Sequence, residues 1–300
     1  MRMSIVAAGA AVALAGLGSL SPAQAGDPRS GLQIQVVQGL FRDVPPGMVK
    51  VLGGPLRQLI ANKTGLTGDV DTAPDALTLA DRLKANQCQL GVFHGFEFAW
   101  AKARNPGLVP LVVTVYPAGN PQACVVVRDD SKIASLADLK DDQITIPRGT
   151  KGHCFAYLAH KRGATAPCQT CPATAEEALD AVVNGTGQAV LVDVGAYQGY
   201  EKLQPGAFKH LRVLCKSEKF PPNVIAYNKG ALSPQAADQL RKVLIEASAT
   251  PGGKPLMTLW SIKGFAAVPA DYDEQLEKCA KVYPAPVKPT AAADGIGMNP

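Results

Sequence analysis

The sequence contains only one long apolar run, Ile5 to Leu17, which is about half as long as a membrane-spanning helix. We therefore expect no transmembrane helix in the mature chain. Charged residues make up only 18% and aromatic residues only 6% of the 300 residues, whereas 47% are hydrophobic. Disordered chains combine low hydrophobicity with high net charge, so this composition excludes disorder as the general state and predicts a packed core.

The motifs of common enzymes are also missing. There is no Gly-x-Ser-x-Gly elbow, no P-loop and no His-Glu-x-x-His. The four histidines are scattered, and His153 and Cys154 are too close in sequence to indicate a base and a nucleophile. Together with Cys168 and Cys171 they are chemically possible zinc or copper ligands, but their spacing is irregular. We expect no catalytic residue, no metal site and no cofactor.

The amino terminus has the pattern of a secretory signal. Arg2 supplies a positive charge, the apolar run follows, and Ala23-Gln24-Ala25 is a small-x-small cleavage site. We expect residues 1–25 to be removed after Ala25; a buried helix is the alternative, but the run has no polar face. Loss of Arg2 lowers the formal net charge from +5 to +4, which is not the charge density of a nucleic-acid-binding protein.

The cysteines are seven, an odd number, so at least one is unpaired or held by another group. In an exported protein the oxidising compartment favours disulfides. Cys168 and Cys171 are the only close pair, and Pro172 excludes c-type haem attachment. We expect a loop disulfide between these two or a bridge from one of them to Cys154. A catalytic dithiol is the alternative, although the neighbouring prolines favour a loop over the helix start that such a dithiol needs.

Strand and helix patterns alternate along the chain. Strands are expected at 32–37, 90–93, 108–116, 123–128, 143–146 and 189–192. Helices are expected at 48–62, 76–84, 96–103, 153–160, 174–183 and 234–247. Such alternation predicts an α/β fold with mainly parallel sheets flanked by helices.

Two runs of these units, separated by the strands at 108–128, predict two lobes. Segments 211–215 and 223–227 are the expected return connection. Lobe 1 would then comprise 26–116 and 222–283, and lobe 2 would comprise 117–221. The Pro- and Ala-rich segment 284–300 is typical of a disordered tail.

Five segments carry a family resemblance by their order along the chain: Gly91 to Gly95, 125–140 with its Ser-x-x-Ala-Asp-Leu-Lys block, Gly149 to Gly152, 189–197 and Phe220 to Asn223. In this order they resemble the periplasmic substrate-binding proteins of phosphonate, phosphite and phosphate ABC importers. The resemblance implies the type II periplasmic-binding-protein fold, with two lobes joined by two crossing strands and the ligand in the cleft between them. It also implies a monomeric periplasmic protein that catalyses nothing and delivers its ligand to a membrane permease.

The turn Arg148-Gly149-Thr150-Lys151-Gly152 is the strongest candidate for anion binding. It joins an expected strand to an expected helix, and the free N–H groups and dipole of a helix amino terminus favour anions. Its glycines permit close approach, Thr150 offers a hydroxyl, and Arg148 and Lys151 offer charge. The alternative is an ordinary turn with solvated cations. The resembled family has Ser-Thr-Ser-Gly here, and only Thr150 and Gly152 match it.

Three further loops supply candidate ligand contacts. Phe41 and Arg42 follow the first expected strand, where they could wall the cleft and hold an oxyanion. His94 and Gly95 form a turn after the strand 90–93, although His94 could equally be structural; a family tyrosine contact is replaced by Ala99. The resemblance implies that Asp193 accepts hydrogen bonds from a protonated ligand oxygen or amine, and the alternative is a helix N-cap.

The sequence therefore predicts a periplasmic solute-binding protein that captures a small oxyanion for an ABC importer. The competing hypothesis is a binding-protein fold recruited as a periplasmic accessory or sensor subunit that recognises a protein partner. The Cys168/Cys171 loop and the altered turn at 149–152 favour that alternative slightly.

Overall fold

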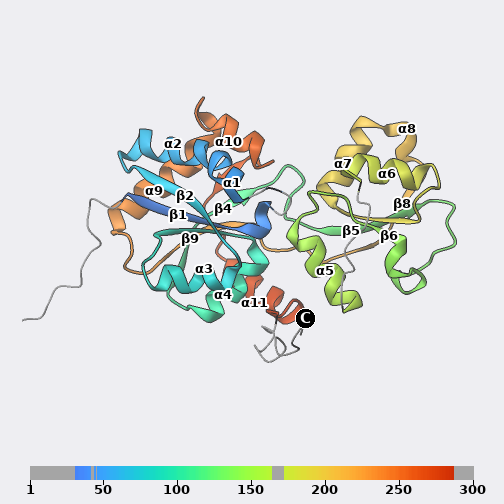
Figure 1. Ribbon diagram of the computed structural model, residues 1–300, viewed down its shortest axis with the longest axis horizontal. Coiled ribbons are helices and arrows are strands. Elements are labelled where there is room, and N and C mark those ends of the chain that lie inside the picture. Colours follow the sequence, from blue (N-terminus) through green and yellow to red (C-terminus); the bar gives the residue numbers. More distant parts are fainter. Residues whose placement is uncertain (1–30, 42–43, 45, 164–171, 287–300) are drawn as a thin grey trace, which may run out of the picture.

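The computed structural model describes residues 31–41, 44, 46–163 and 172–286, which form two lobes side by side, each on its own β-sheet (Figure 1). Several expected features lie outside the described residues: the leader 1–25, Arg42, Cys168, Cys171 and all of the expected tail after residue 286.

The first lobe is built on a six-stranded sheet with the order β10-β4-β9-β3-β1-β2. Its strands are β1 (Leu32–Val37), β2 (Gly68–Ala73), β3 (Leu90–Phe93), β4 (Leu108–Val115), β9 (Val224–Asn228) and β10 (Gly264–Ala266). Successive side chains of a strand point to opposite faces, so Ile34 and Val36 enter one apolar cluster while Val37 enters another.

Helices cover both faces of this sheet (Figure 1). One face carries α1 (Pro46–Leu52), α2 (Gly54–Thr64), α9 (Pro234–Glu246) and α10 (Lys254–Leu259), with the short 3-10 helices η1 (Gln38–Phe41) and η4 (Ala247–Ala249). The other face carries α3 (Ala76–Lys84), α4 (Gly95–Arg104) and α11 (Tyr272–Val282). The sheet is therefore buried between two helical layers.

The second lobe is built on a four-stranded sheet with the order β6-β7-β5-β8. Its strands are β5 (Ala123–Arg128), β6 (Ile144–Thr145), β7 (Ala189–Asp193) and β8 (Leu211–Lys216). The helix α5 (Gly152–Arg162) covers one face, and α6 (Ala175–Val183), α7 (Val194–Leu203) and α8 (Pro205–Phe208) cover the other (Figure 1). Two 3-10 turns, η2 (Leu136–Asp138) and η3 (Asp141–Gln143), precede β6.

The α/β class and the two sheets are confirmed, but the expectation of mainly parallel sheets is not. Three strand pairs are parallel and five are antiparallel in the described chain. The reason is the route of the chain: β9 returns from the second lobe and enters between β3 and β4, so it runs against both. Alternating strand and helix patterns in the sequence indicate βα units, but they do not indicate the direction of a strand that returns from the other lobe.

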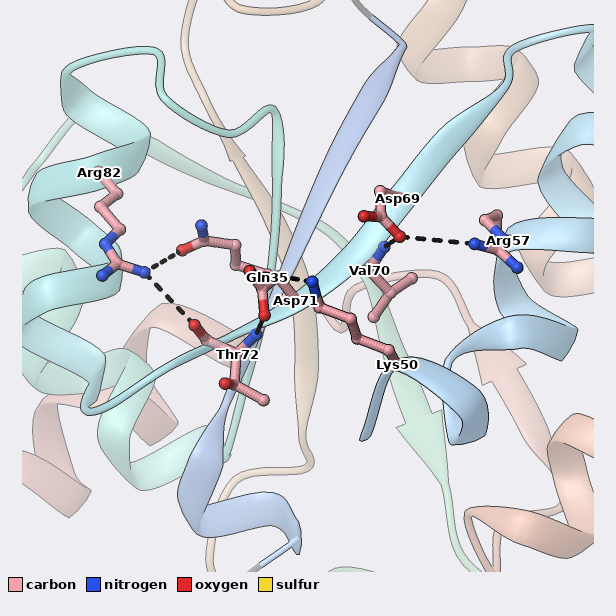
Figure 2. Close-up of polar contacts among 8 residues, drawn as sticks. All are labelled: Gln35, Lys50, Arg57, Asp69, Val70, Asp71, Thr72 and Arg82. Carbon is pink, nitrogen blue, oxygen red and sulfur yellow. Dashed lines mark hydrogen bonds and ion pairs between the residues drawn. The ribbon is translucent and has the colours of Figure 1, made fainter. Parts of the chain in front are cut away.

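The edge strand β2 was not expected from the sequence, because its residues Gly-Asp-Val-Asp-Thr-Ala are too polar for a buried strand. Asp69 is paired with Arg57 at 3.4 Å and Asp71 with Lys50 at 3.8 Å. Figure 2 shows these pairs on one side of the strand, with Arg82 on the other side, donating to Gln35 at 2.9 Å. Charges on an edge strand discourage pairing with another chain, which explains a polar strand at this position.

Cys154 corrects one of the two expected disulfides, the bridge from Cys154 to Cys168 or Cys171. Its thiol is free and fully buried in α5, where it packs in the apolar cluster between the sheet of the second lobe and α5. Burial first, and then the nearby Asp193 charge, raise the pKa of Cys154 well above its ordinary value, so the thiol is neutral. A buried free cysteine behaves as a small apolar side chain.

Two links join the lobes, at 116–122 and 217–223, and they run together. The Phe220 N–H donates to the Pro121 carbonyl at 2.8 Å, and the Ser217 N–H donates to the Ala123 carbonyl at 2.9 Å. The ring of Phe220 also packs against Phe96 of α4. The connection between the lobes is therefore hydrogen-bonded and apolar rather than a loose linker.

Tyr283, directly after α11, ties the first lobe to this connection. Its carbonyl accepts from the indole N–H of Trp100 at 2.7 Å, and its hydroxyl donates to Glu218 at 2.7 Å. Its ring lies 4.6 Å from that of Phe220 and 5.3 Å from that of His160 in α5. Tyr283 thus contacts the first lobe through its carbonyl, and the second link and the second lobe through its side chain.

We expect Tyr283→Phe to lower the free energy of unfolding by about 1 kcal/mol, because it removes the hydroxyl bond to Glu218 but keeps the ring contacts. Urea unfolding of both proteins measures this. Tyr227→Phe is the control, since the described residues show no hydrogen bond from the Tyr227 hydroxyl. Equal midpoints for the two variants would contradict the assignment.

Candidate functional site

Two cavities lie between the lobes. The larger, about 320 Å³, is lined by the link 116–122, the amino end of α7 at 193–196, Lys151 and Ser261. The smaller, about 190 Å³, lies over the ends of β1, β3 and β4 and is walled by η1 and the end of α10. Tyr116, Lys151 and Ser261 line both. These three residues therefore mark the boundary where the cavities meet.

Lys151 and Asp193 form the charged part of the site. Each is the N-cap residue of a helix of the second lobe: Lys151 follows β6 and precedes α5, and Asp193 is the last residue of β7 and precedes α7. The Lys151 ammonium is 3.4 Å from Asp193 Oδ1, and His153 Nε2 is 2.8 Å from Asp193 Oδ2. Helix amino termini favour negative charge, so the Asp193 carboxylate and a ligand anion are both favoured here.

The protonation of this group follows from its surroundings. Burial alone would raise the pKa of Asp193, but contact with His153, the Lys151 charge and the Gly195 N–H lower it to about 2. Burial lowers the pKa of His153, against the opposing effect of Asp193, so the imidazole is neutral at pH 7. Asp193 is therefore a fixed carboxylate, and the N-cap expected as its alternative role is also present, since its Oδ1 accepts from Gly195 at 2.9 Å.

Lys151 is held but remains accessible. Its ammonium lies 5.3 Å from the centre of the Tyr116 ring, and 42% of its side chain is exposed. Burial raises the pKa of Tyr116 above its ordinary value, so the phenol stays neutral. A neutral aromatic face and one carboxylate position the cation without covering it.

His94 and two glycines set how closely the lobes approach. His94 is buried, lines the smaller cavity, and stacks on Phe96 at 5.3 Å. A Cβ at Gly152 would lie 2.8 Å from His94 Nε2, and one at Gly95 would lie 2.1 Å from the Pro221 carbonyl. Gly95 is outside both cavities, and it is needed there because only a residue without a side chain lets α4 pack this closely on the second link.

The expected anion-binding turn is only partly directed at the cleft. Gly149 and Lys151 line the smaller cavity. The Thr150 hydroxyl donates to the Pro147 carbonyl at 2.6 Å and is buried inside the turn. Arg148 is exposed and lines a small cavity of about 80 Å³ with Thr150; this cavity shares Lys151 with both interlobe cavities. Of the expected hydroxyl and two cations, Lys151 alone lines the interlobe cavities.

The wall contributed by the first lobe contains residues that the sequence analysis did not single out. The ring of Phe41, a residue that the sequence analysis did single out, lies 6.3 Å from the ring of Trp260, and both residues line the smaller cavity. The Trp260 indole nitrogen is shielded from solvent and has no acceptor among the described residues. Buried donors are normally satisfied, so a ligand acceptor at this wall would be stabilised.

Ser261 has an unusual backbone conformation at the meeting point of the cavities. Its φ is +51°, a left-handed value that favours glycine. It follows α10 in a Schellman arrangement, in which Ser261 donates to Thr258 at 3.1 Å and Ile262 donates to Met257 at 3.0 Å. No sequence motif indicates this position, because its return to the cleft depends on the whole fold.

Two absences hold for the described part of the chain. None of its helices has the length and apolar character needed to cross a membrane. Across 31–41, 44, 46–163 and 172–286, no group of three or more His, Cys, Asp or Glu side chains is arranged to hold a metal ion.

The family model described as the periplasmic substrate-binding protein of phosphonate ABC transporters matches residues 43–273. Curated protein sequences give no match.

Solved structures share the fold at low identity. A binding-protein component of an ABC phosphonate transporter from Pseudomonas aeruginosa has a TM-score of 0.54 and 18% identity, covering 84% of this chain and 87% of that one. PhnD1 from Prochlorococcus marinus, in complex with methylphosphonate, has a TM-score of 0.55 and 9% identity, covering 85% and 98%. A Xanthomonas citri protein bound to ATP has a TM-score of 0.55 and 17% identity, covering 84% and 96%.

We expect Asp193→Asn to remove a pH-dependent part of the stability. Because the pKa of Asp193 is about 2 in the folded state against an ordinary 3.8, the carboxylate stabilises the fold above about pH 4, and this is lost as pH falls towards 2. Neutral His153 adds a loss in the same direction below pH 6.5.

Asparagine keeps the acceptor for Gly195, so the variant should lose about 2 kcal/mol at pH 7 and about half of that at pH 3, which lies between the folded and ordinary pKa values. Urea unfolding at pH 7, 5 and 3 measures the difference, with exposed Asp142→Asn as the control. A difference independent of pH would show that charge is not the cause.

We expect Ser261→Gly to raise the free energy of unfolding by about 0.5–1 kcal/mol, because glycine adopts the left-handed conformation without a Cβ clash. Ser261→Ala keeps the Cβ and should give no gain. Thermal unfolding separates the two, and equal melting temperatures would contradict strain at this position.

Proposed function

Because the chain belongs to the family of periplasmic substrate-binding proteins of phosphonate ABC transporters, we propose that it captures a phosphonate or a related oxyanion between its lobes. Members of this family are binding components of transporters, with a small ligand and a permease as partners, and not enzymes. The observation that carries the proposal is Lys151, an accessible cation at the amino end of α5 that lines both interlobe cavities.

The anion would be held by charge and by helix ends. Its oxygens accept from the Lys151 ammonium and lie near the amino ends of α5 and α7. Asp193 stays ionised and so accepts a hydrogen bond from a protonated ligand oxygen or a ligand amine. This favours a singly protonated oxyanion over a fully ionised one, because a bare oxygen would repel the carboxylate.

Capture closes the cleft. The cavities are lined from both lobes, by Lys151 and 193–196 on one side and by Trp260 and Ser261 on the other, so a ligand that touches both walls favours the closed arrangement. The lobes turn about the links 116–122 and 217–223. Lobe 1 then comprises 26–116 and 222–283, and lobe 2 comprises 117–221.

The export features complete the proposal. The family implies a periplasmic location. Residues 1–25 act as the leader and are cut after Ala25, the mature protein acts as a monomer, and Cys168 pairs with Cys171. The free thiol of Cys154 supports this pairing over a bridge to Cys154.

We expect methylphosphonate to bind the purified protein, and Lys151→Met to weaken binding at least tenfold, because a charge-assisted hydrogen bond contributes about 1.5–3 kcal/mol. Isothermal titration calorimetry measures both affinities. Lys202→Met is the matched control, since Lys202 is an exposed lysine at the far end of α7.

An unchanged affinity in Lys151→Met would exclude Lys151 as the anion contact. Absence of binding to methylphosphonate, phosphite, phosphate and 2-aminoethylphosphonate, from protein shown to be free of carried-over ligand, would favour the accessory hypothesis instead.

A further inference from the structure

The smaller cavity differs in chemistry from the larger one. On the first lobe it has an apolar wall beside the polar His94 and Thr114; this wall comes from η1 and the end of α10, with Leu40, Phe41, Leu259 and Trp260. Val36, Val92 and Ile262 extend the same surface. The larger cavity instead has the charged pair Lys151 and Asp193 and the amino end of α7.

The four side chains of this wall offer an inorganic oxyanion one unpaired donor, the Trp260 indole N–H, and are otherwise apolar. Moving a charged or polar group from water against apolar side chains costs free energy unless hydrogen bonds replace its hydration. Leu259, which lines this cavity, keeps 38% of its surface exposed, and Phe41 is only half-buried. Apolar surface left uncovered inside a cleft gains free energy when an apolar ligand group covers it.

The two cavities are placed for one ligand. Lys151, Tyr116 and Ser261 line both, so a head group at the Lys151 ammonium lies beside the opening of the smaller cavity. The smaller cavity is about 190 Å³, and an apolar cavity of about 150 Å³ is known to take benzene. The space therefore fits a substituent of the size of one ring.

We propose that the ligand is an organophosphonate with an apolar substituent of about this size, whose head meets Lys151 and whose substituent fills the smaller cavity. This rests on the proposed function, because it assumes capture of a phosphonate, and it adds which phosphonates are preferred. Phe41, Leu259 and Trp260 are then the residues that determine specificity, while Lys151 provides the charge common to all ligands.

The test compares three ligands that differ in the substituent: inorganic phosphate, methylphosphonate and phenylphosphonate. Calorimetry should give phenylphosphonate an affinity at least tenfold higher than methylphosphonate, because even one additional buried methylene can contribute tenfold discrimination. Its binding should also have the more negative heat-capacity change, which is the mark of buried apolar surface. Phosphate should bind no more tightly than methylphosphonate.

Paired variants locate the substituent. Leu259→Asn should remove most of the preference for phenylphosphonate and leave methylphosphonate affinity within about twofold, because it makes the wall polar without touching the head group. Leu203→Asn is the matched control, since Leu203 is also exposed, at 67%, but lies at the end of α7 outside both cavities.

The outcomes separate the two proposals. Equal affinities for methylphosphonate and phenylphosphonate, or tighter binding of phosphate, would overturn the apolar subsite while leaving phosphonate capture in place. A preference for phenylphosphonate that survives Leu259→Asn would also overturn it as placed here. If none of the three ligands binds, capture itself has failed and this inference fails with it.

Discussion

Asp193 lies between Lys151 and His153 at the end of β7, and its charge has to be kept inside a site where only 11% of its side chain is exposed. The lysine, the neutral imidazole and the Gly195 N–H together outweigh the cost of burial and hold the carboxylate ionised. This arrangement positions the Lys151 ammonium in the cleft, beside the amino ends of α5 and α7. The proposed binding of an anion in the cleft depends on it.

The two lobes also share an apolar contact on one side. The apolar cluster between the second sheet and α5 includes Phe96, Cys279 and Tyr283, which belong to the first lobe. The lobes are therefore packed together on the side of α11 (Figure 1). The cavities instead lie beside the end of α10 and the start of α7. In the proposed closure the cleft changes more than this packed joint, so that ligand binding in the cavities alters the relative position of the lobes.

Most strands of the fold and the two charged residues of the site could be predicted from the sequence. Apolar periodicity predicted β1, β3, β4, β5 and β7, and strand-to-helix turns predicted that Lys151 and Asp193 would lie at helix starts, because those properties are local. The edge strand β2 was missed because its charges suit an edge and not a core. Trp260 and Ser261 were missed because their place in the cleft depends on the return of the chain through β9 and α10. Thr150 was a candidate ligand contact because of its sequence pattern, but its hydroxyl instead donates to the Pro147 carbonyl within its own turn.

The central claim is that a phosphonate lies between the lobes with its oxygens on Lys151. A crystal structure of the protein grown with methylphosphonate tests it most directly. The account predicts the phosphonate group in the interlobe space, with an oxygen within hydrogen-bonding distance of the Lys151 ammonium and the lobes closed over it. A phosphonate bound elsewhere on the protein, with the Lys151 ammonium paired only with Asp193, would contradict the account.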